Sequence, residues 1–208
     1  MPSEIYSYLE ETAKKIIENK DFLTELDREI GDSDHGINMA RGFNAVLEKV
    51  SKDENDFGAA LKKTGMTLLS TVGGASGPLY GTAYMEAGKV LNGKSDLTPE
   101  DLKKVFEVVI SGIQKRGHAV KGEKTMLDSI IPAYEKYCES LNENNNMIQS
   151  LENACKAAED GVEFTKTIIA TKGRASYLGE RSIGHQDPGA TSATIILKTT
   201  LDFLKNKS

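Results

Sequence analysis

Apolar residues recur along most of the chain three or four positions apart, the spacing that places side chains on one face of an α-helix. The first such stripe consists of Ile5, Leu9, Ala13, Ile16 and Ile17. The same spacing predicts seven further helices, over residues 36–50, 55–71, 76–92, 98–115, 125–141, 147–170 and 189–204. Alternating patterns typical of β-strands are scarce. The pattern therefore predicts an all-α protein, and the mostly short connections favour a single-domain bundle or barrel over residues 1–208.

The connections between the predicted helices differ in length and character. Thr98, Pro99 and Asp101 mark a helix start, because they combine a capping hydroxyl, a first-turn proline and an acid near the positive helix end. The polar run 142–146 separates two helices. In contrast, residues 172–188 form a connection of about seventeen residues with three glycines and two arginines. A compact bundle does not need such a long loop, so this one indicates a function.

Composition and net charge argue against several classes of partner and location. The 208 residues carry a net charge of −5 and a pI of about 5.4, so no basic stripe is available for nucleic acid, which is not expected as a partner. Cys138 and Cys155 lack metal-binding spacing and are expected to be thiols in a reducing setting. The sequence shows neither a signal-peptide pattern nor an apolar run of about 18 residues. We therefore expect a cytoplasmic protein that does not interact with a membrane.

Three carboxylates gather around one glycine at Asp27, Asp32 and Asp34. Carboxylates this close repel one another, and hard cations such as Mg²⁺ relieve the repulsion by taking oxygen ligands. Mg²⁺ keeps much of its coordination for water and phosphate oxygens, and the segment precedes a predicted helix start. We interpret it as a metal site for a phosphate-containing ligand, with a nucleotide as the first candidate. The alternatives are a solvated acidic face and, for Asp34 alone, a helix cap.

Two further glycine-containing connections, residues 72–78 and 117–125, also lead into predicted helices. Their small residues let backbone N–H groups approach a ligand at a helix start. Residues 117–125 nearly match a P-loop, but Glu123 separates the second glycine from Lys124, and the preceding stretch is helical rather than strand-like. A P-loop is therefore rejected, and these connections are interpreted as loops that meet the acidic segment at one end of a bundle.

Four motifs follow one another along the chain. They are Gly31-Asp-Ser-Asp-His-Gly36, Gly73-Gly-Ala-Ser-Gly-Pro-Leu-Tyr-Gly81, Lys124-Thr-Met-Leu-Asp128 and Gly173-Arg-Ala-Ser-Tyr-Leu-Gly-Glu-Arg-Ser-Ile-Gly-His-Gln-Asp-Pro-Gly189. In this order they resemble the ADP-binding L subunits of dihydroxyacetone kinase, and the match covers nearly the whole chain. The resemblance implies an antiparallel eight-helix barrel that holds a nucleotide and two Mg²⁺ ions at one end.

The resemblance also implies roles for residues at matching positions. It assigns Asp27, Asp32 and Asp34 as metal ligands. Arg174 matches a phosphate-side arginine, which we expect to stabilise charge on the transferring phosphoryl group. The implied nucleotide contacts are His35, Asn38, Ala75, Ser76, Gly117, Met126, Arg174, Asp187, Pro188 and Gly189. One position departs from the family motif, because Glu123 stands where an aspartate is expected, and its role stays open.

Some of these residues also have plain structural interpretations. Asp187 and Pro188 form a good helix start, with an N-cap acid followed by proline in the first helical position. On spacing alone, Met126 is more typical of core packing than of a contact with adenine. Only the motifs assign these residues to a nucleotide.

The resemblance further implies partners and a reaction. A chain of this length corresponds to the nucleotide part alone, so we expect a stand-alone subunit of the phosphotransferase-system type. Tightly held ADP or ATP would act as a coenzyme, rephosphorylated in place by the phosphohistidine-carrying M subunit and used to phosphorylate dihydroxyacetone on the K subunit. Two alternatives remain: a kinase subunit that exchanges ATP or serves a related hydroxylated substrate, and a nucleotide-dependent regulator of a transcription factor. A homodimer is also left open.

Overall fold

The computed structural model describes residues 2–144 and 146–207. Within these residues the chain forms nine α-helices, one 3-10 helix and no β-strand, so the all-α prediction is confirmed. None of the described helices has the length and hydropathy needed to cross a membrane. The elements are α1 (Glu4–Glu18), α2 (Lys20–Ile30), α3 (His35–Lys49), α4 (Phe57–Thr71), α5 (Ser76–Val90), α6 (Pro99–Gly117), α7 (Leu127–Asn144), α8 (Met147–Thr165), η1 (Arg174–Ser182) and α9 (Pro188–Lys207).

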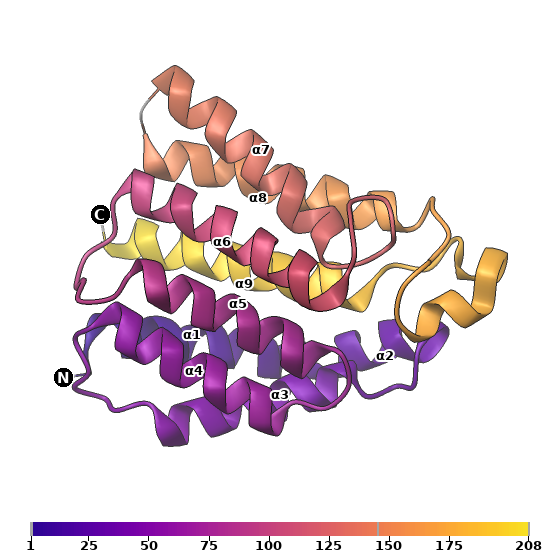
Figure 1. The fold of residues 1–208 in the computed structure, drawn as a ribbon, viewed down its shortest axis with the longest axis horizontal. Coiled ribbons are helices and arrows are strands. Elements are labelled where there is room, and N and C mark those ends of the chain that lie inside the picture. The colour runs from indigo at the N-terminus through magenta and orange to yellow at the C-terminus, as the bar shows by residue number, and fades with distance from the viewer. Residues whose placement is uncertain (1, 145, 208) are drawn as a thin grey trace.

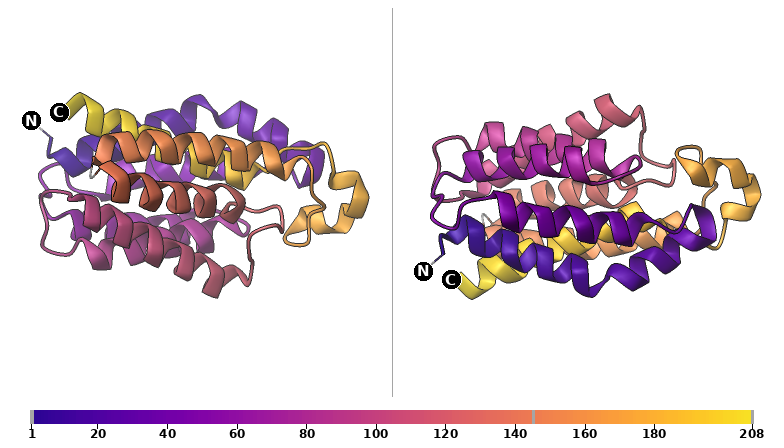
Figure 2. Two further views of the ribbon diagram at one scale, coloured as in Figure 1. Left: turned by 90° about the horizontal axis from the view of Figure 1, so that it is seen from above. Right: turned by 90° about the horizontal axis from the view of Figure 1, so that it is seen from below.

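Eight of these helices form a closed ring, shown along its length in Figure 1 and from two further sides in Figure 2. Around the ring, α1 contacts α3, the helices α4 to α9 follow in chain order, and α9 contacts α1 again. Neighbouring helices run antiparallel, because the chain turns back at each end of the ring, mostly through short connections. The predicted eight-helix barrel is therefore confirmed.

The two ends of the barrel differ in what they carry. Both chain termini lie at one end, which we call the terminal end (Figure 1). The connections 31–34, 72–75, 118–126 and 166–187 lie at the opposite end, which we call the loop end. The glycine-containing loops and the acidic segment therefore meet, as the sequence predicted.

Helix α2 was not predicted from the sequence. It follows α1 after the single residue Asn19 and extends past the ring at the loop end (Figure 1). Its buried positions Leu23, Asp27 and Ile30 have helical spacing. Because one of the three is a carboxylate, only two apolar residues mark the buried face, and these are too few for the periodicity to predict a helix.

Three predicted helix ends are wrong by three residues or more, one of them that of the helix predicted over 189–204, which runs to Lys207. The helix predicted over 147–170 ends at Thr165, whose hydroxyl donates to the Val162 carbonyl (2.6 Å), while the Lys166 N–H bonds to Glu163 (3.1 Å). The helix predicted over 125–141 instead runs to Asn144, and residue 145 of the polar connection lies outside the described residues. The long connection before α9 contains η1, a short 3-10 helix in a segment predicted to be a loop.

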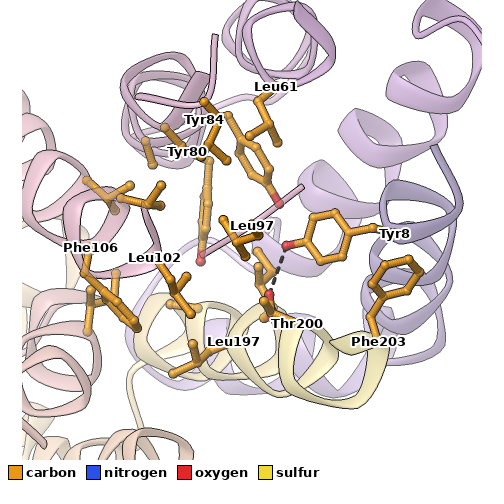
Figure 3. Close-up of a pocket in the computed structure, with 18 of the residues that line it drawn as sticks. Tyr8, Leu61, Tyr80, Tyr84, Leu97, Leu102, Phe106, Leu197, Thr200 and Phe203 are labelled. Carbon is orange, nitrogen blue, oxygen red and sulfur yellow. Dashed lines mark hydrogen bonds between the residues drawn. The ribbon is translucent and has the colours of Figure 1, made fainter. Parts of the chain in front are cut away.

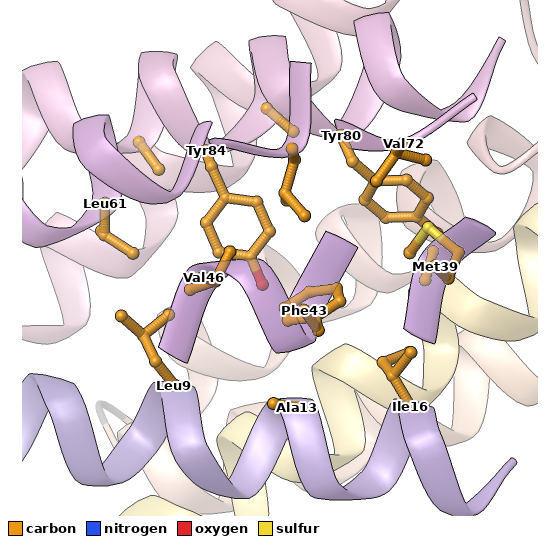
Figure 4. Close-up of a cluster of buried hydrophobic side chains, with 14 of the residues drawn as sticks. Leu9, Ala13, Ile16, Met39, Phe43, Val46, Leu61, Val72, Tyr80 and Tyr84 are labelled. Carbon is orange, nitrogen blue, oxygen red and sulfur yellow. The ribbon is translucent and has the colours of Figure 1, made fainter. Parts of the chain in front are cut away.

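Two clusters of buried apolar side chains hold the ring together. In the first, α1 faces α3 and α5, as Figure 4 shows for Leu9, Ala13, Ile16, Met39, Phe43, Val46 and Tyr84. The second lies among α6 to α9 and includes Leu102, Phe106, Ala133, Tyr137, Leu141, Leu151 and Leu201. Fully burying one large apolar side chain contributes about 1.5–3 kcal/mol. The ring is thus stabilised along its length by apolar packing between neighbouring helices.

The interior of the ring contains a mostly apolar cavity of about 210 Å³. Tyr8, Tyr80 and Tyr84 lie around it, together with leucines and phenylalanines of α4, α6 and α9 (Figure 3). The Tyr8 hydroxyl is 3.0 Å from Thr200 Oγ1, a hydrogen bond that joins α1 to α9 (Figure 3). The ring therefore closes around this interior through both packing and a polar contact.

Candidate functional site

A cavity of about 470 Å³ opens at the loop end, among the connections that join α2 to α3, α4 to α5, α6 to α7 and α8 to α9. Helices α3, α5, α7 and α9 begin at this end, so the positive ends of their dipoles lie there. The predicted site residues that line the cavity are Asp27, Asp32, Asp34, His35, Ala75, Ser76, Gly117, Met126, Arg174, Asp187, Pro188 and Gly189. The fold thus gathers residues that are far apart in sequence around one opening.

The acidic cluster is formed by the end of α2 and the turn into α3. Asp27, Asp32 and Asp34 each offer a carboxylate oxygen, and these oxygens lie within 4.8 Å of one another. Gly31 allows this arrangement, because a Cβ at this position would lie 2.0 Å from Asp27 Oδ1. Three converging carboxylates are the oxygen donors that Mg²⁺ or Ca²⁺ prefers, so the donor set fits a hard divalent cation.

Asp27, rather than Asp34, caps the start of α3. Asp27 Oδ2 accepts hydrogen bonds from the N–H groups of Asp34 (2.8 Å) and His35 (3.1 Å). Asp34 occupies the N-cap position, but its side chain makes no capping hydrogen bond. Burial raises the pKa of the Asp34 carboxyl, a nearby Asn38 lowers it, and the charges of the other two aspartates raise it again. The cap interpretation of Asp34 is therefore wrong, and a cation would stabilise its charged form.

Arg174, the first residue of η1, lies against this cluster. Its Nε is 2.7 Å from Asp32 Oδ2, and its side chain is 68% exposed. An exposed ion pair of this kind contributes only about 0–1 kcal/mol, so a phosphate group can compete for the guanidinium. The preceding Gly173 has φ of 61°, in the left-handed region that favours glycine, and turns the chain toward the cavity wall.

His35 is the centre of a buried hydrogen-bonded network. Its Nδ1 is 3.0 Å from Ser76 Oγ and its Nε2 is 2.8 Å from Ser192 Oγ. Ser192 Oγ in turn lies 2.6 Å from the Tyr80 hydroxyl. Burial lowers the pKa of His35 to about 4, so the imidazole is neutral near pH 7, with one ring nitrogen donating and the other accepting. The network fixes the relative positions of α3, α5 and α9 beside the cavity.

The turn from α4 to α5 forms the wall next to His35. Gly74 has φ of 65°, and Ala75 and Ser76 follow it at the start of α5. Asn38 lies behind this wall: it is buried, and its Oδ1 accepts a hydrogen bond from Arg41 (2.7 Å). Among the predicted site residues within the described chain, Asn38 is the one that does not line the cavity. In this structure Asn38 supports the site from behind.

The start of α9 closes another side of the cavity. Asp187 Oδ2 accepts a hydrogen bond from the Ala190 N–H (2.6 Å), and Pro188 is the first helical residue, so the predicted N-cap arrangement is confirmed. Burial raises the pKa of Asp187 to about 7, against the opposing effects of Ala190 and Lys124. Both residues also line the cavity, so the cap and the binding interpretations are compatible.

Met126 likewise fits both of its interpretations. It is buried within the core cluster that includes α1, α3 and α5, and it also lines the loop-end cavity. Gly117 lines the same cavity at the end of α6, where a Cβ would lie 3.0 Å from Leu79 Cδ2. These two residues thus form an apolar part of the cavity wall.

The sequence did not assign several residues that the structure places on the cavity wall. They are Tyr80, Arg116, Lys124, Thr125, Lys172 and Gly173. Three of the six are cations facing an end of the molecule that carries three clustered carboxylates. Lys124 opens the Lys124–Asp128 motif and Lys172 directly precedes Gly173, so a cation at the edge of a motif is the signal that could have identified these two. Tyr80 carries no such signal, because its position in the sequence is typical of an aromatic residue of the core.

Comparisons with known proteins agree with this architecture. A protein-family model described as the DAK2 domain matches residues 29–202. The chain is 46% identical over 197 residues to the ADP-binding subunit DhaL of the PEP-dependent dihydroxyacetone kinase of Escherichia coli, covering 94% of each chain. It is 43% identical to the corresponding subunit of kinase 1 of Listeria innocua, covering 93% of this chain and 92% of that one.

A solved structure has the same fold. The crystal structure of the dihydroxyacetone kinase of C. freundii in complex with AMP-PNP and Mg²⁺ superposes with a TM-score of 0.71 at 23% identity. The match covers 97% of this chain and 34% of that one. Because the family model covers most of the chain and the DhaL subunits match over nearly their full length, the chain belongs to the DAK2 domain family.

Proposed function

We propose that this chain is the nucleotide-binding subunit of a dihydroxyacetone kinase of the phosphotransferase-system type, and that residues 1–208 act as one domain. The observation that carries the proposal is the convergence of Asp27, Asp32 and Asp34 at a cavity where four helices begin. Carboxylates for metal ions and helix N-termini for phosphates are the two features that binding of a nucleotide with Mg²⁺ requires. The names of the DhaL relatives support ADP as that nucleotide.

The three aspartates would hold two Mg²⁺ ions together with the phosphates of ADP or ATP. When bound, the ions supply charge neutralisation and orient the terminal phosphate for in-line transfer. Asp27 holds the turn 31–34 through its contacts with the two backbone N–H groups, which keeps the other two carboxylates in place. His35, Ser76 and the start of α9 then form the wall along the phosphates.

Arg174 is proposed as the catalytic residue. Its guanidinium already lies beside the acidic cluster, within 2.7 Å of Asp32, and carries five N–H donors. On this proposal it leaves Asp32 for the phosphoryl group and stabilises the charge that spreads over the oxygens during transfer. The aspartates are assigned to metal binding, so no general base is placed on this chain. The test is the Arg174→Ala variant, for which turnover should fall while Mg²⁺ binding is retained; unchanged turnover would exclude this role.

The proposed reaction involves two partner subunits. A phosphohistidine M subunit of the phosphotransferase system rephosphorylates the bound ADP, and a K subunit presents dihydroxyacetone to the resulting ATP. The names of the relatives, which include "PTS-dependent" and "PEP-dependent" kinases, support this pair of partners. The proposal places the chain in the cytoplasm, where free thiols such as Cys138 and Cys155 stay reduced.

The deciding experiment is to purify the chain in Mg²⁺ without added nucleotide, denature it, and identify the released compounds by mass spectrometry. Near-stoichiometric ADP supports a bound coenzyme. Mixing the chain with purified K and M subunits, phosphoenolpyruvate and the upstream phosphotransferase proteins should then produce dihydroxyacetone phosphate. An empty site that binds ATP reversibly would favour an exchanging kinase, and binding without any transfer would favour a nucleotide-dependent regulator of a transcription factor.

A further inference from the structure

Lys124 is an almost completely buried cation that the proposed reaction does not use. Its side chain is 2% exposed, and it is one of the largest fully buried side chains in the described chain. It lies in the 118–126 connection, and its φ of 60° is a conformation that residues with a Cβ rarely adopt. A buried lysine in a strained backbone conformation is costly, so it must be compensated by specific contacts.

The compensation comes from three backbone carbonyls. Lys124 Nζ donates to Thr165 O (2.5 Å), His185 O (2.5 Å) and Ile168 O (3.5 Å). These three acceptors match the three N–H donors of an ammonium group. Thr165 is the last residue of α8, so the ammonium also satisfies a helix-end carbonyl at the negative end of the helix dipole.

The three acceptors belong to the two limbs of one segment. Thr165 and Ile168 lie where the 166–187 connection leaves α8, and His185 lies where it returns to α9. Between these limbs the segment carries η1 with Arg174, and at its end stands Asp187, both on the wall of the candidate nucleotide cavity. One ammonium group therefore ties the outgoing and the returning limb at the base of a loop that reaches the site.

Glu123 holds the outgoing limb a little further along. Its Oε1 accepts a hydrogen bond from Thr171 Oγ1 (3.0 Å), and its carbonyl accepts one from the Thr171 N–H (3.3 Å). Its Oε2 accepts from the Val120 N–H (2.8 Å), which fixes the carboxylate within its own connection. The residue that departs from the family motif thus makes a contact that an aspartate, shorter by one methylene, would reach less easily.

Two nearby carboxylates favour the charged form of the Lys124 ammonium, as its three carbonyl partners do. Burial lowers the pKa of Lys124, while the carboxylates of Asp187 and Asp128 raise it. Asp128 is itself held by the N–H groups of Gly122 and Thr125, in the same connection. The ammonium therefore combines hydrogen bonds to three carbonyls with the longer-range attraction of two carboxylates, and the three hydrogen bonds hold one geometry of the loop base.

We propose that Glu123 and Lys124 form a clamp that positions the 166–187 segment over the bound nucleotide and so sets how long the nucleotide stays bound. The inference rests on the proposed function, because it takes the loop-end cavity as the nucleotide site. Lys124 is a positioning residue here: it acts through Arg174 and Asp187, which its contacts hold at the cavity. The metal ligands lie on α2 and the turn into α3, outside the clamped segment.

The experiment compares wild type with Lys124→Met, which keeps the length and removes the charge and the donors. We expect dissociation of labelled ADP, chased with unlabelled ADP in Mg²⁺, to be about tenfold or more faster. In the nucleotide-free protein, we expect faster hydrogen exchange at Ala170, Thr171, Gly184 and Asp187, whose N–H groups bond within or to the clamped segment. Mg²⁺ affinity measured without nucleotide should stay within about twofold of wild type.

Two further variants and a control make the result specific. Lys124→Arg keeps the charge and should restore part of the ADP retention that Lys124→Met loses. Thr171→Val removes only the side-chain contact with Glu123 at the exposed limb. It should fold even if Lys124→Met does not, and it should speed ADP release about two- to threefold. The control is Lys121→Met, because Lys121 is a half-exposed lysine of the same connection that pairs with Glu135 (2.9 Å) and should change neither quantity.

Each outcome decides the proposal. Unchanged hydrogen exchange in the 166–187 segment, in Lys124→Met or in Thr171→Val if the former does not fold, would overturn the clamp. Faster exchange with unchanged ADP release would show that the loop does not control retention, and would overturn the inference as well. If wild type binds no ADP, the proposed function fails and the retention role fails with it, whereas the exchange data still decide whether the clamp exists.

Discussion

The two ends of the barrel use acidic side chains in different ways. At the terminal end, Asp56 accepts hydrogen bonds from the N–H groups of Gly58, Ala59 and Gly93, and Asp101 completes a capping box with Thr98. At the loop end, three carboxylates converge within 4.8 Å, and Arg174 is paired with one of them. These acids of the terminal end satisfy backbone groups, whereas the loop end also gathers three carboxylates of which one is paired with an exposed arginine.

Two helix starts show the physical basis of this difference. Asp56 precedes α4 and Asp187 precedes α9, and both accept hydrogen bonds from first-turn N–H groups. The hydrogen bond from the Ala59 N–H holds the pKa of the half-buried Asp56 below its usual range. Burial raises the pKa of Asp187 to about 7. The capping hydrogen bond favours the charged carboxylate in both cases, but at Asp187 the effect of burial is larger and the neutral form is favoured.

The largest expected difference between the ends concerns ligand binding. Asp34→Asn should weaken Mg²⁺-dependent ADP binding about 100-fold, or ~3 kcal/mol, because it removes a charged metal ligand. Asp56→Asn is the matched control, since it makes the same change at a helix start on the terminal end and should leave ADP affinity unchanged. Isothermal titration of both variants with ADP in Mg²⁺ measures the effect. Equal losses in the two variants would contradict the assignment of the metal site.

The second prediction concerns pH. A raised pKa means that folded Asp187 binds a proton more readily than unfolded Asp187, so its contribution to stability is lost as pH rises from about 4 through about 7. Compared with Asp187→Asn, wild type should therefore lose on the order of a few kcal/mol of unfolding free energy between pH 5 and 8. Asp56 behaves oppositely, because its contribution is lost only as pH falls through its lowered pKa. Urea unfolding of the ligand-free protein, measured in a chelator at several pH values, tests both pH dependences of the unfolding free energy.

The third prediction compares two buried serines. Ser192→Ala removes contacts to His35 Nε2 and the Tyr80 hydroxyl at the loop end, and should cost about 1–3 kcal/mol of stability and several-fold in ADP affinity. Ser140→Ala removes the acceptor for the Asn144 and Asn153 amides toward the terminal end, and should lower stability without changing ADP affinity. Thermal unfolding and ADP titration of both variants separate the two effects. Loss of ADP affinity in both would show that it follows from general destabilisation.

The smallest expected effects are two opposite changes in the free energy of unfolding, one at each end of the barrel. Thr98→Ala removes a capping box at the terminal end and should lower the unfolding free energy by about 1 kcal/mol. In the metal-free protein, Asp34→Asn should instead raise it, because a neutral amide relieves the repulsion among the carboxylates and makes no worse a helix start. Denaturant titrations in the presence of a chelator measure the change in unfolding free energy of both variants. A loss of stability in Asp34→Asn would mean that its carboxylate has a structural role.

The hydrophobic pattern predicted the eight ring helices and their connections, because their buried faces repeat at helical spacing. It missed α2, where the buried face includes Asp27, and it extended α8 past Thr165. Both errors have the same origin. At the loop end, polar groups that serve the site replace apolar residues, and backbone groups find partners outside their own helix, such as the ammonium of Lys124 at the end of α8.

Most of the residues assigned to the site from the sequence line one cavity, because the motifs that carry them are local. Asp27, Asp32 and Asp34 lie within eight residues, so their convergence follows from one helix end and one turn. Tyr80 and Ser192, in contrast, meet His35 only because α5 and α9 are brought beside α3 by the fold. Periodicity reports which face of a helix is buried, but it carries no information on which other helix that face meets.

The sequence by itself therefore determined the helical class, the acidic cluster and the loops that line the cavity, since each depends on spacing within a short segment. Only the tertiary structure decided the closure of the ring, the capping of α3 by Asp27, and the pairing of Arg174 with Asp32. It also decided the burial of Lys124 between the two limbs of the 166–187 segment. Except for the capping by Asp27, which depends on how the turn 31–34 folds back, these features join residues tens of positions apart or depend on burial, and burial is a property of the packed chain rather than of any segment.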